Sequence, residues 1–411
     1  MRVIRLTRSA YGNGFIIGKA NKMDIRSFLN LYGKVENWKR FAKEMWMDPT
    51  IERNISNWTQ EDLYHCAETA YQKRIAAIPD LNKYPELKGM DAYIIDYMKG
   101  LAEGTELSFK DIIFSSFWYD VYKYARGEGF LTHEFGKNEK ARNSDLGWEC
   151  TAIVFTNTDV GVVIGRNTDD GPVQDYVYTI NRCGEPLLIL RPAELGYSTV
   201  DTPLAGINEK GLAMSGASTY YKEEKEGGEI FPANVHDLVM RHCSTLDEAV
   251  EMIMRYNTFT SRSGNTAIVD GNGDAAVVEK SLMECGILRP KEGEEYAFTT
   301  AGVAVHPKMR KLMDDSTDSY KFNLKRHATI KRIIEGEAEL GVEAMWKVIR
   351  NHTLPSPVCR HLDEKARTSN IATLIQGVMV PKQGRYWVSY VEPGPKFPCS
   401  VEPVEHRYFF Y

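Results

Sequence analysis

The chain has 411 residues, of which 43% are hydrophobic and 26% are charged, and its formal net charge is -5. These values are typical of an ordinary globular protein with a large core, and the length permits roughly one to three domains. The weak acidity and the lack of a basic stripe with interleaved aromatic residues give no reason to expect nucleic acid as a partner. No apolar run of about 18 residues occurs, and no apolar signal core follows the basic residues at 1–8, so no membrane partner is predicted.

Amphipathic patterns predict a mainly helical segment before residue 127. The expected helices cover residues 24–45, 62–78, 91–102 and 108–124. Thr59 and Ser108 each precede an aspartate by three positions, which is typical of an N-cap with a box-like start. Residues 127–149 are rich in glycine, asparagine and lysine and predict an exposed loop, where a break in the chain would be tolerated.

Beyond residue 150 the pattern predicts strands with a few helices between them. The expected strands are 151–156, 160–165, 176–181, 186–190, 212–218, 266–270, 275–279, 371–379 and 386–391. The expected helices are 235–242, 246–256, 320–335 and 342–352. Strands in a run with grouped helices indicate an α+β fold in layers, without βαβ alternation.

Cys150 stands at the head of the first of these strands. A hairpin centred near residues 158 and 159 would place Arg166 beside Thr151 and Asn167 beside Cys150. The thiol, the Arg166 guanidinium and the Asp169 carboxylate would then gather at one strand end, and a neighbouring cation favours the nucleophilic thiolate. On spacing alone, however, a lone cysteine in an apolar strand is more often a small buried hydrophobic residue.

Cys150-Thr151 at the head of a strand, with Gly165-Arg166-Asn167-x-Asp169 closing the hairpin, resembles amidases whose nucleophile is the mature N-terminal residue. The chain is similar to choloylglycine hydrolases and more closely resembles the penicillin acyltransferase-like (acyl-coenzyme A:6-aminopenicillanic acid acyltransferase) family, whose members carry a long segment before the cysteine. This resemblance implies a four-layer αββα sandwich of the N-terminal nucleophile hydrolase type over 150–411. It also implies that the mainly helical segment 1–149 is released as a light chain that stays associated.

Four further segments resemble parts of these families: residues 98–112, 206–212, 265–279, and 352–361 with 368–371. The last contains His352, Cys359 and His361, which are metal-ligand types, but only three cluster in the sequence and no paired cysteine spacing completes a site. A structured loop that fixes the final strand pair is the preferred interpretation. No metal and no cofactor are therefore predicted.

The groups that would stabilise negative charge depart from the family pattern. Where relatives carry asparagines, this chain has Ser218 and Thr300, whose hydroxyls can also donate hydrogen bonds. Asn208, which leads into an active-site strand in relatives, and Arg326, which resembles a late family arginine, are further candidates for oxyanion or substrate binding. A tight turn explains Asn208 and a solvated helix face explains Arg326 equally well.

The resemblance implies a cysteine amidohydrolase or acyltransferase that cleaves itself between Glu149 and Cys150 and acts on a small linear, non-peptide amide through an acyl-enzyme. Arg166 would orient the substrate, and Asp169 would hold the freed α-amino group. Glu149 itself departs from the family, because many relatives have glycine there. The alternative interpretation of Arg166 and Asp169 is a surface salt bridge at a hairpin end.

Two other functions remain open. One is a cysteine hydrolase that does not cleave itself and uses His306 or His327 as its base. The other is a catalytically silent scaffold or binding protein that keeps the fold. The seven widely spaced cysteines, an odd number, predict a reducing compartment, and we expect the cytoplasm. The two fragments would remain together, and a homo-oligomer is compatible with the sequence.

Overall fold

The computed structural model describes residues 9–407 apart from 21, 45–48, 78–87, 89, 126, 128–149, 171–176, 180–187, 191–204, 209, 220, 222–234, 257–263, 282–283, 314, 317, 362–371 and 391–396. Most of the predicted loop at 127–149, including Glu149, lies outside these ranges, as do the late-motif residues 368–371. No helix within the described ranges combines the length and the apolar character that crossing a membrane requires.

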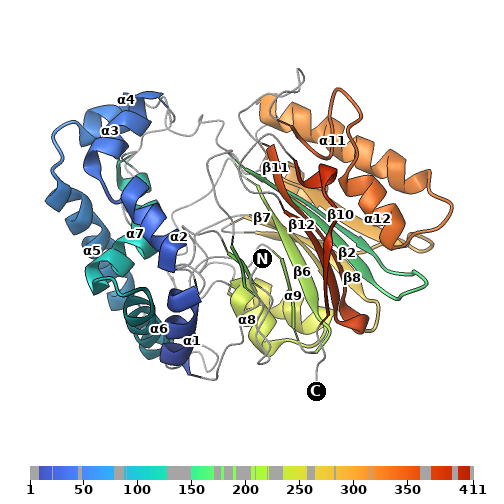
Figure 1. Ribbon diagram of the computed structural model, residues 1–411. Coiled ribbons are helices and arrows are strands. Elements are labelled where there is room, and N and C mark those ends of the chain that lie inside the picture. The colour runs from blue at the N-terminus through green and yellow to red at the C-terminus, as the bar shows by residue number, and fades with distance from the viewer. Residues whose placement is uncertain are drawn as a thin grey trace.

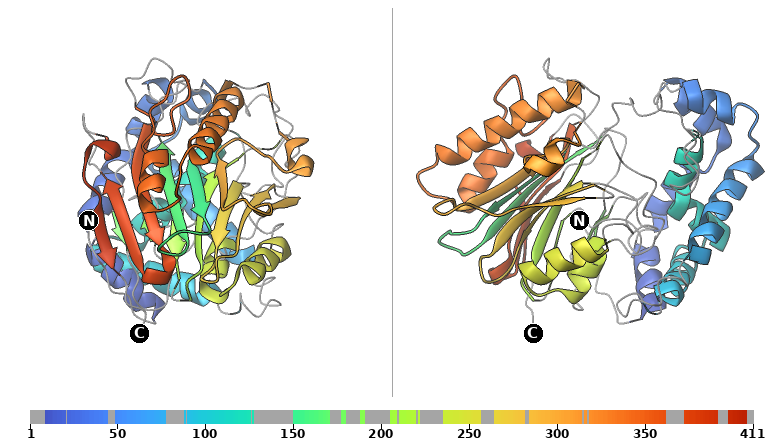
Figure 2. Two further views of the ribbon diagram at one scale, coloured as in Figure 1. Left: turned by 90° about the vertical axis from the view of Figure 1, so that its right-hand side faces the viewer. Right: turned by 180° about the vertical axis from the view of Figure 1, so that it is seen from behind.

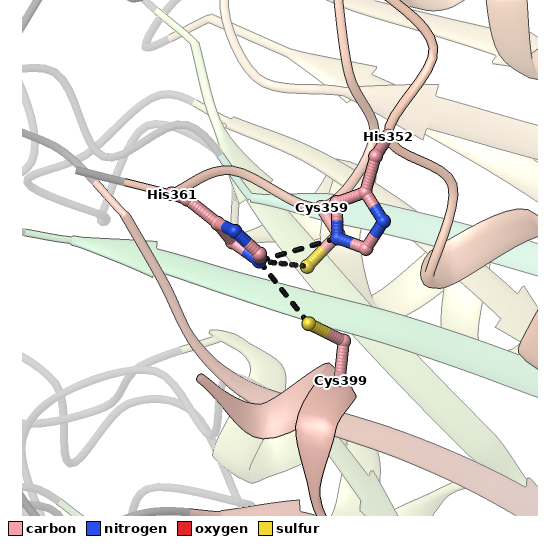
Figure 3. Close-up of side chains that lie close together, drawn as sticks. All are labelled: His352, Cys359, His361 and Cys399. Carbon is pink, nitrogen blue, oxygen red and sulfur yellow. Dashed lines mark hydrogen bonds between the residues drawn. The ribbon is translucent and has the colours of Figure 1, made fainter. Parts of the chain in front are cut away.

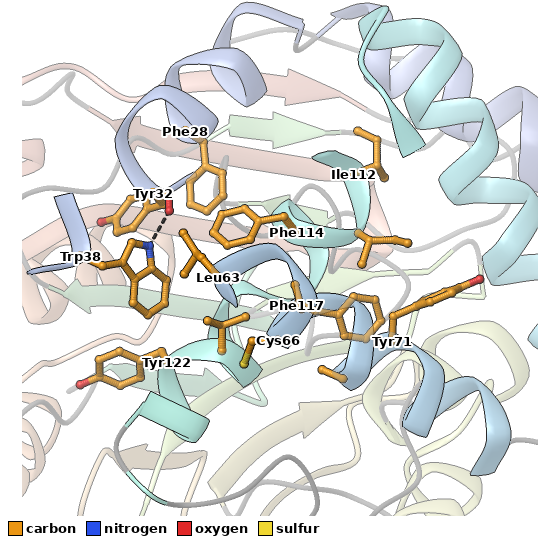
Figure 4. Close-up of a cluster of buried hydrophobic side chains, with 14 of the residues drawn as sticks. Phe28, Tyr32, Trp38, Leu63, Cys66, Tyr71, Ile112, Phe114, Phe117 and Tyr122 are labelled. Carbon is orange, nitrogen blue, oxygen red and sulfur yellow. Dashed lines mark hydrogen bonds between the residues drawn. The ribbon is translucent and has the colours of Figure 1, made fainter. Parts of the chain in front are cut away.

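The described residues before Cys150 form helices that lie together on one side of the molecule (Figure 1). Their bounds are α1 Ala10–Ala20, α2 Lys22–Tyr32, α3 Val35–Glu44, α4 Pro49–Ile55, α5 Gln60–Ala77, α6 Met90–Thr105 and α7 Phe109–Ala125. Aromatic and aliphatic side chains from α2, α3, α5 and α7 fill a common core (Figure 4). The helical character of this segment is therefore confirmed, and the predicted caps at Thr59 and Ser108 accept hydrogen bonds from the amides of Asp62 and Asp111.

Three features of this segment differ from the prediction, and one of them is the short helix α4, which was not predicted. The single helix expected over 24–45 is interrupted at Gly33 and Lys34, where α2 ends and α3 begins. Helix α1 was not predicted, because its glycine and asparagine residues have a low helix propensity. Gly14 and Gly18 of α1 face Gly100 and Gly104 of α6 so closely that a Cβ atom at any of them would overlap the backbone of the other helix. Tertiary packing thus overrides the local preference.

Two antiparallel sheets follow. The first has the order β10-β1-β2-β11-β12-β13, and the second has the order β5-β6-β7-β8-β9. Their strands are β1 Thr151–Phe155, β2 Val163–Asp170, β5 Ala205–Ile207, β6 Ala213–Ser218, β7 Gly264–Val269, β8 Ala275–Lys280, β9 Cys285–Leu288, β10 Tyr296–Thr300, β11 Ala372–Val380, β12 Arg385–Tyr390 and β13 Val404–Arg407. A separate pair comprises β3 Val177–Thr179 and β4 Leu188–Leu190.

The sheets pack face to face, and helices cover both outer faces (Figures 1 and 2). Alternate residues of each strand point inward, so that Ala152, Val154 and Ala267 share one core between the sheets. Helices α8 Val235–His242 and α9 Leu246–Arg255 pack on the second sheet, while α11 Asp318–Glu335 and α12 Val342–Ile349 pack on the first. The short helix α10 Pro307–Arg310 precedes α11 in the chain. The four-layer αββα sandwich is confirmed.

The β1–β2 hairpin has a register one residue away from the predicted one. Thr151 pairs with Asn167, and Ala152 pairs with Arg166. A one-residue slip moves every side chain of a strand to the other face. In the predicted register Arg166 would have shared a face with Thr151. In the structure Arg166 shares the inner face with Ala152. Cys150, which precedes Ala152 by two positions, lies on the same face.

Candidate active site

Cys150 lies at the head of β1, between the two sheets. Its side chain is 1% exposed and packs against Ala217 of the second sheet and Ala301. The amide of Ala301 donates a hydrogen bond of 2.9 Å to the Cys150 carbonyl oxygen, which extends the β1–β10 ladder to the cysteine itself. The backbone of Cys150 is therefore held by the first sheet, and its side chain contacts residues of both sides of the core.

Arg166 is the charged partner of the thiol. Its Nη2 lies 3.2 Å from Cys150 Sγ. Its Nε donates to Thr168 Oγ1 at 2.7 Å, and its Nη1 donates to Ser215 Oγ at 3.1 Å and to the Gly216 carbonyl. The guanidinium thus bridges β2 and β6, and its planar fork holds one N–H group toward the sulfur. A cation placed this way favours the thiolate.

Asp169 lies on the other face of β2 and is paired with Arg326. Arg326 Nη2 donates to Asp169 Oδ2 at 2.6 Å, and Thr373 Oγ1 donates to Asp169 Oδ1 at 2.7 Å. Burial raises the pKa of Asp169, while Arg326 and Thr373 act in the opposite direction. The predicted gathering at the strand end is thus divided: Arg166 meets Cys150 directly, and the Asp169 carboxylate is held by Arg326 from α11.

The structure rules out the alternative interpretations, which were a surface salt bridge for Arg166 and Asp169 and a solvated helix face for Arg326. Arg166 is 1% exposed, and both Asp169 and Arg326 are 0% exposed. Arg326 also donates to the Val358 carbonyl in the loop that follows α12. An ion pair without contact to solvent is costly to desolvate, and the hydrogen bonds from Thr373 and to the Val358 carbonyl offset part of this cost.

Ser218 and Thr300 adjoin residues that touch Cys150, but strand alternation directs their own side chains elsewhere. Ala217 and Ala301 make the contacts with the cysteine, so Ser218 and Thr300 point to the opposite faces of their strands. The Thr300 hydroxyl is buried without a hydrogen-bond partner among the described residues. The structure therefore brings neither predicted hydroxyl to the thiol. The family resemblance indicated the positions of these residues in the chain, but not the face of the strand on which their side chains lie.

Asn208 belongs to a turn and has no remaining capacity for a substrate. Its Nδ2 donates to the carbonyl oxygens of Met240 and Cys243, and its Oδ1 accepts from the amides of Lys210 and Leu212. These four bonds use both donors and both lone pairs of the side-chain amide. The turn interpretation therefore explains Asn208. Arg326, a further candidate from the sequence, binds Asp169 in the protein interior.

Two buried polar residues near the site were not assigned a role from the sequence. Asn265 lies opposite Ala217 in the β6–β7 ladder, and its Nδ2 donates to Thr299 Oγ1 at 3.0 Å and to the Val303 carbonyl at 2.6 Å. Tyr386 lies over Gly377, which is the β11 partner of Arg166. The hairpin motif that contains Asn265 is too common in globular proteins to indicate a role. Only the pairing of strands in the sheets shows that Asn265 and Tyr386 lie near the site.

The two histidines considered as alternative bases have other surroundings. His327 packs on Phe298, with 4.3 Å between ring centroids, at the outer face of the first sheet, and burial lowers its pKa to about 4. His306 is the N-cap of α10 and accepts a hydrogen bond from the Lys308 amide through Nδ1. The sheet separates the His327 ring from the inner face that carries Cys150, which speaks against His327 as the base.

Residues 156–393 match the family of acyl-coenzyme A:6-aminopenicillanic acid acyl-transferase, and this match spans more than half of the chain. The chain belongs to this family. The matched region begins shortly after Cys150 and includes Arg166, Asp169, Arg326 and the loop after α12. Comparison with curated proteins gives no match.

Solved structures similar to the chain include a hydrolase and an acylase. A variant of conjugated bile acid hydrolase from Clostridium perfringens has 15% identity and a TM-score of 0.35, over 64% of this chain and 97% of that chain. Penicillin V acylase from Agrobacterium tumefaciens has 16% identity and a TM-score of 0.38, over 62% of this chain and 84% of that chain.

Proposed function

We propose that this protein is a cysteine N-terminal nucleophile amidohydrolase or acyltransferase acting on a small linear, non-peptide amide. The observation that carries the proposal is the 3.2 Å contact between Arg166 Nη2 and Cys150 Sγ at the head of β1, in a member of this acyltransferase family. A strand-fixed thiol beside a buried cation has the properties of a nucleophile. Core packing alone does not require the cation.

The first step of the proposal is self-cleavage. Cys150 Sγ attacks the Glu149 carbonyl carbon, the peptide bond breaks, and the acyl group moves from nitrogen to sulfur. Water then hydrolyses the thioester, which leaves a carboxylate on Glu149 and a free thiol and α-amino group on Cys150. In this proposal the light chain 1–149 and the heavy chain 150–411 stay associated after cleavage.

The freed α-amino group then serves as the base for the neighbouring thiol. The unperturbed pKa values of an α-amino group and of a thiol differ by less than about one unit, so proton transfer between them is inexpensive near neutral pH. Asn167 pairs with Thr151 in the β1–β2 ladder, and Asp169 lies two positions further along β2. Its carboxylate holds the ammonium form of the α-amino group. Arg326 and Thr373 fix its carboxylate for this role.

Turnover proceeds through an acyl-enzyme. The Cys150 thiolate attacks the amide carbonyl of the substrate, the amine leaves with a proton from the α-ammonium group, and a thioester remains. Water releases the acid, or a second amine or thiol accepts the acyl group. Arg166 orients the substrate while its bonds to Ser215 and Gly216 keep it in place.

Denaturing intact-mass analysis of the purified chain tests the proposal. Two fragments are expected, and the heavier begins Cys-Thr-Ala-Ile-Val-Phe. Cys150→Ala should give one species of 46.7 kDa without amidase activity, while Cys285→Ala, a matched change at a cysteine of β9, should cleave and react as the parent does. A single uncleaved parent species that hydrolyses amides would instead favour a histidine-based cysteine hydrolase.

Two measurements separate the remaining possibilities. A panel of N-acyl amides assayed for released amine, with and without acceptor amines, distinguishes hydrolysis from acyl transfer and narrows the substrate. A thiol-directed electrophile that labels the cysteines indifferently, in a protein inactive on the whole panel, would favour a silent scaffold. The six described cysteines form no disulfide, which is compatible with the proposed reducing, cytoplasmic setting.

A further inference from the structure

Four metal-ligand side chains meet where the loop after α12 approaches the C-terminal segment (Figure 3). They are His352, Cys359, His361 and Cys399, and their ligand atoms all lie within 4.8 Å of one another. The sequence brings only the first three together. Cys399 is 38 positions beyond His361 and comes from the short 3-10 helix η8, Pro398–Ser400.

The spacing of these atoms matches a tetrahedral zinc site. His352 Nε2 and His361 Nε2 are 3.2 Å apart, Cys359 Sγ and His361 Nε2 are 3.8 Å apart, and His361 Nε2 and Cys399 Sγ are 3.1 Å apart. Zinc bonds of about 2.0–2.1 Å to nitrogen and about 2.3 Å to sulfur place tetrahedral ligands about 3.3–3.8 Å from each other. One cation at the centre would therefore need only small adjustments of these side chains.

Hydrogen bonding alone does not explain the convergence. His361 Nε2 faces three heteroatoms, yet an imidazole nitrogen has either one proton or one lone pair to offer. Two histidine nitrogens and two sulfurs directed at one point are the ligand set that zinc prefers. Because all four positions are supplied by protein, the set corresponds to a closed structural site and leaves no position for a substrate.

The surroundings hold the ligands in place. The His361 ring stacks on Phe397, with centroids 3.8 Å apart and planes at 6°. Cys359 is 0% exposed, and its amide and that of Val358 both donate to the Asn351 carbonyl. One histidine lies nearer the surface, since His352 is exposed. These contacts orient two ligands before any ion binds, which lowers the cost of binding.

We infer that His352, Cys359, His361 and Cys399 bind one structural zinc ion, which fastens the loop at 351–361 to the segment at 397–401. This inference departs from the metal-free prediction made from the sequence, because the fourth ligand is distant in the chain. The loop carries the Val358 carbonyl, which accepts hydrogen bonds from Asn167 and Arg326. The ion thus supports the outer face of the first sheet, behind the Arg326–Asp169 pair.

Metal content of the full-length chain tests the inference. Protein purified without chelators and desalted should contain about one zinc ion per chain by inductively coupled plasma mass spectrometry. Cys399→Ser should lower this content at least about tenfold, because a serine hydroxyl is a poor zinc ligand. Cys285→Ser and Cys150→Ala should keep it, which separates this site from other thiols and from the proposed nucleophile.

A spectroscopic readout covers the case in which Cys399→Ser does not fold. After exchange of the ion in the unaltered chain, cobalt should give a thiolate-to-cobalt charge-transfer band and the visible bands of tetrahedral coordination. Unaltered protein that binds neither zinc nor cobalt would overturn the inference. A Cys359–Cys399 disulfide in freshly purified protein, or full zinc content in Cys399→Ser, would overturn it as well. None of these results depends on whether the chain cleaves itself.

Discussion

Arg326 on α11 and Asp169 on β2 form an ion pair of 2.6 Å in which both side chains are completely buried. The pair connects the outer helical layer to the strand whose other face carries Arg166. Asp169 also accepts from Thr373 of β11, so one carboxylate joins three elements. Removing one partner of such a pair leaves a buried charge without compensation, whereas an exposed pair contributes little.

We therefore expect Arg326→Met to lower the free energy of unfolding by about 3–5 kcal/mol. Urea unfolding should be measured in the Cys150→Ala background, so that the chain stays in one piece. Lys331→Met is the matched control on the same helix, because Lys331 pairs with Glu335 at the surface, and it should cost less than about 1 kcal/mol. Equal effects of the two changes would show that the buried pair has no special role.

Arg166→Gln should slow alkylation of the Cys150 thiol at neutral pH. The variant loses the cation 3.2 Å from the sulfur and keeps a side chain that can bond to Ser215. A loss of about 1.4 kcal/mol of thiolate stabilisation corresponds to about a tenfold lower rate below the thiol pKa. Iodoacetamide labelling followed by peptide mass spectrometry measures the rate, with Cys285 as the internal reference. An unchanged ratio of Cys150 to Cys285 labelling would contradict the proposed role of Arg166.

Glu279 on β8 predicts a dependence of stability on pH. Its carboxylate accepts from the amides of Val305 and His306, and burial raises its pKa to about 7. Because the native state holds the proton more tightly than the unfolded state, the stabilisation is complete below the unfolded pKa near 4.5. It is lost as the pH rises through about 7.

Relative to Glu279→Gln, the parent chain should thus lose up to about 3 kcal/mol of stability between pH 4.5 and pH 7. Urea unfolding at several pH values, again in the Cys150→Ala background, measures the difference. Glu251→Gln, at an exposed position of α9, is the control and should follow the parent curve. If the curve of Glu279→Gln were parallel to that of the parent, Glu279 would not titrate in this range.

The sequence predicted the layers of the sandwich well, because apolar alternation depends on burial alone. It did not predict β5, β9, β10 and β13. The register of the β1–β2 hairpin was wrong by one residue, since the turn residues around Asp159 do not specify where pairing starts. That single position decides whether Arg166 shares a face with Cys150 or points away from it.

The site was predictable only where its residues are close in the chain. Cys150, Arg166 and Asp169 belong to one hairpin, so motif spacing indicated them. Arg326 was indicated by family resemblance, but a solvated helix face explained it equally well, because no local pattern shows that a helical arginine reaches a buried carboxylate. Asn265 reaches the site through the pairing of strands, and Cys399 reaches the other metal-ligand residues because the C-terminal segment folds back beside the loop after α12. Both arrangements depend on contacts between segments that are distant in the chain.

Gly100 of α6 tests how strictly the helical segment before Cys150 is packed. A Cβ atom there would overlap the Tyr11 carbonyl oxygen and approach the Phe15 amide to 2.7 Å. Backbone cannot yield as a flexible side chain does, so α1 and α6 must separate, and Gly100→Ala should lower the unfolding free energy by about 1–3 kcal/mol despite the better helix propensity of alanine. Gly341→Ala is the control, because its nearest neighbour, Asp159 Oδ1, is 3.5 Å away. Unfolding in urea in the Cys150→Ala background compares the two, and a stabilising effect of Gly100→Ala would show that the helices are not in close contact at this glycine.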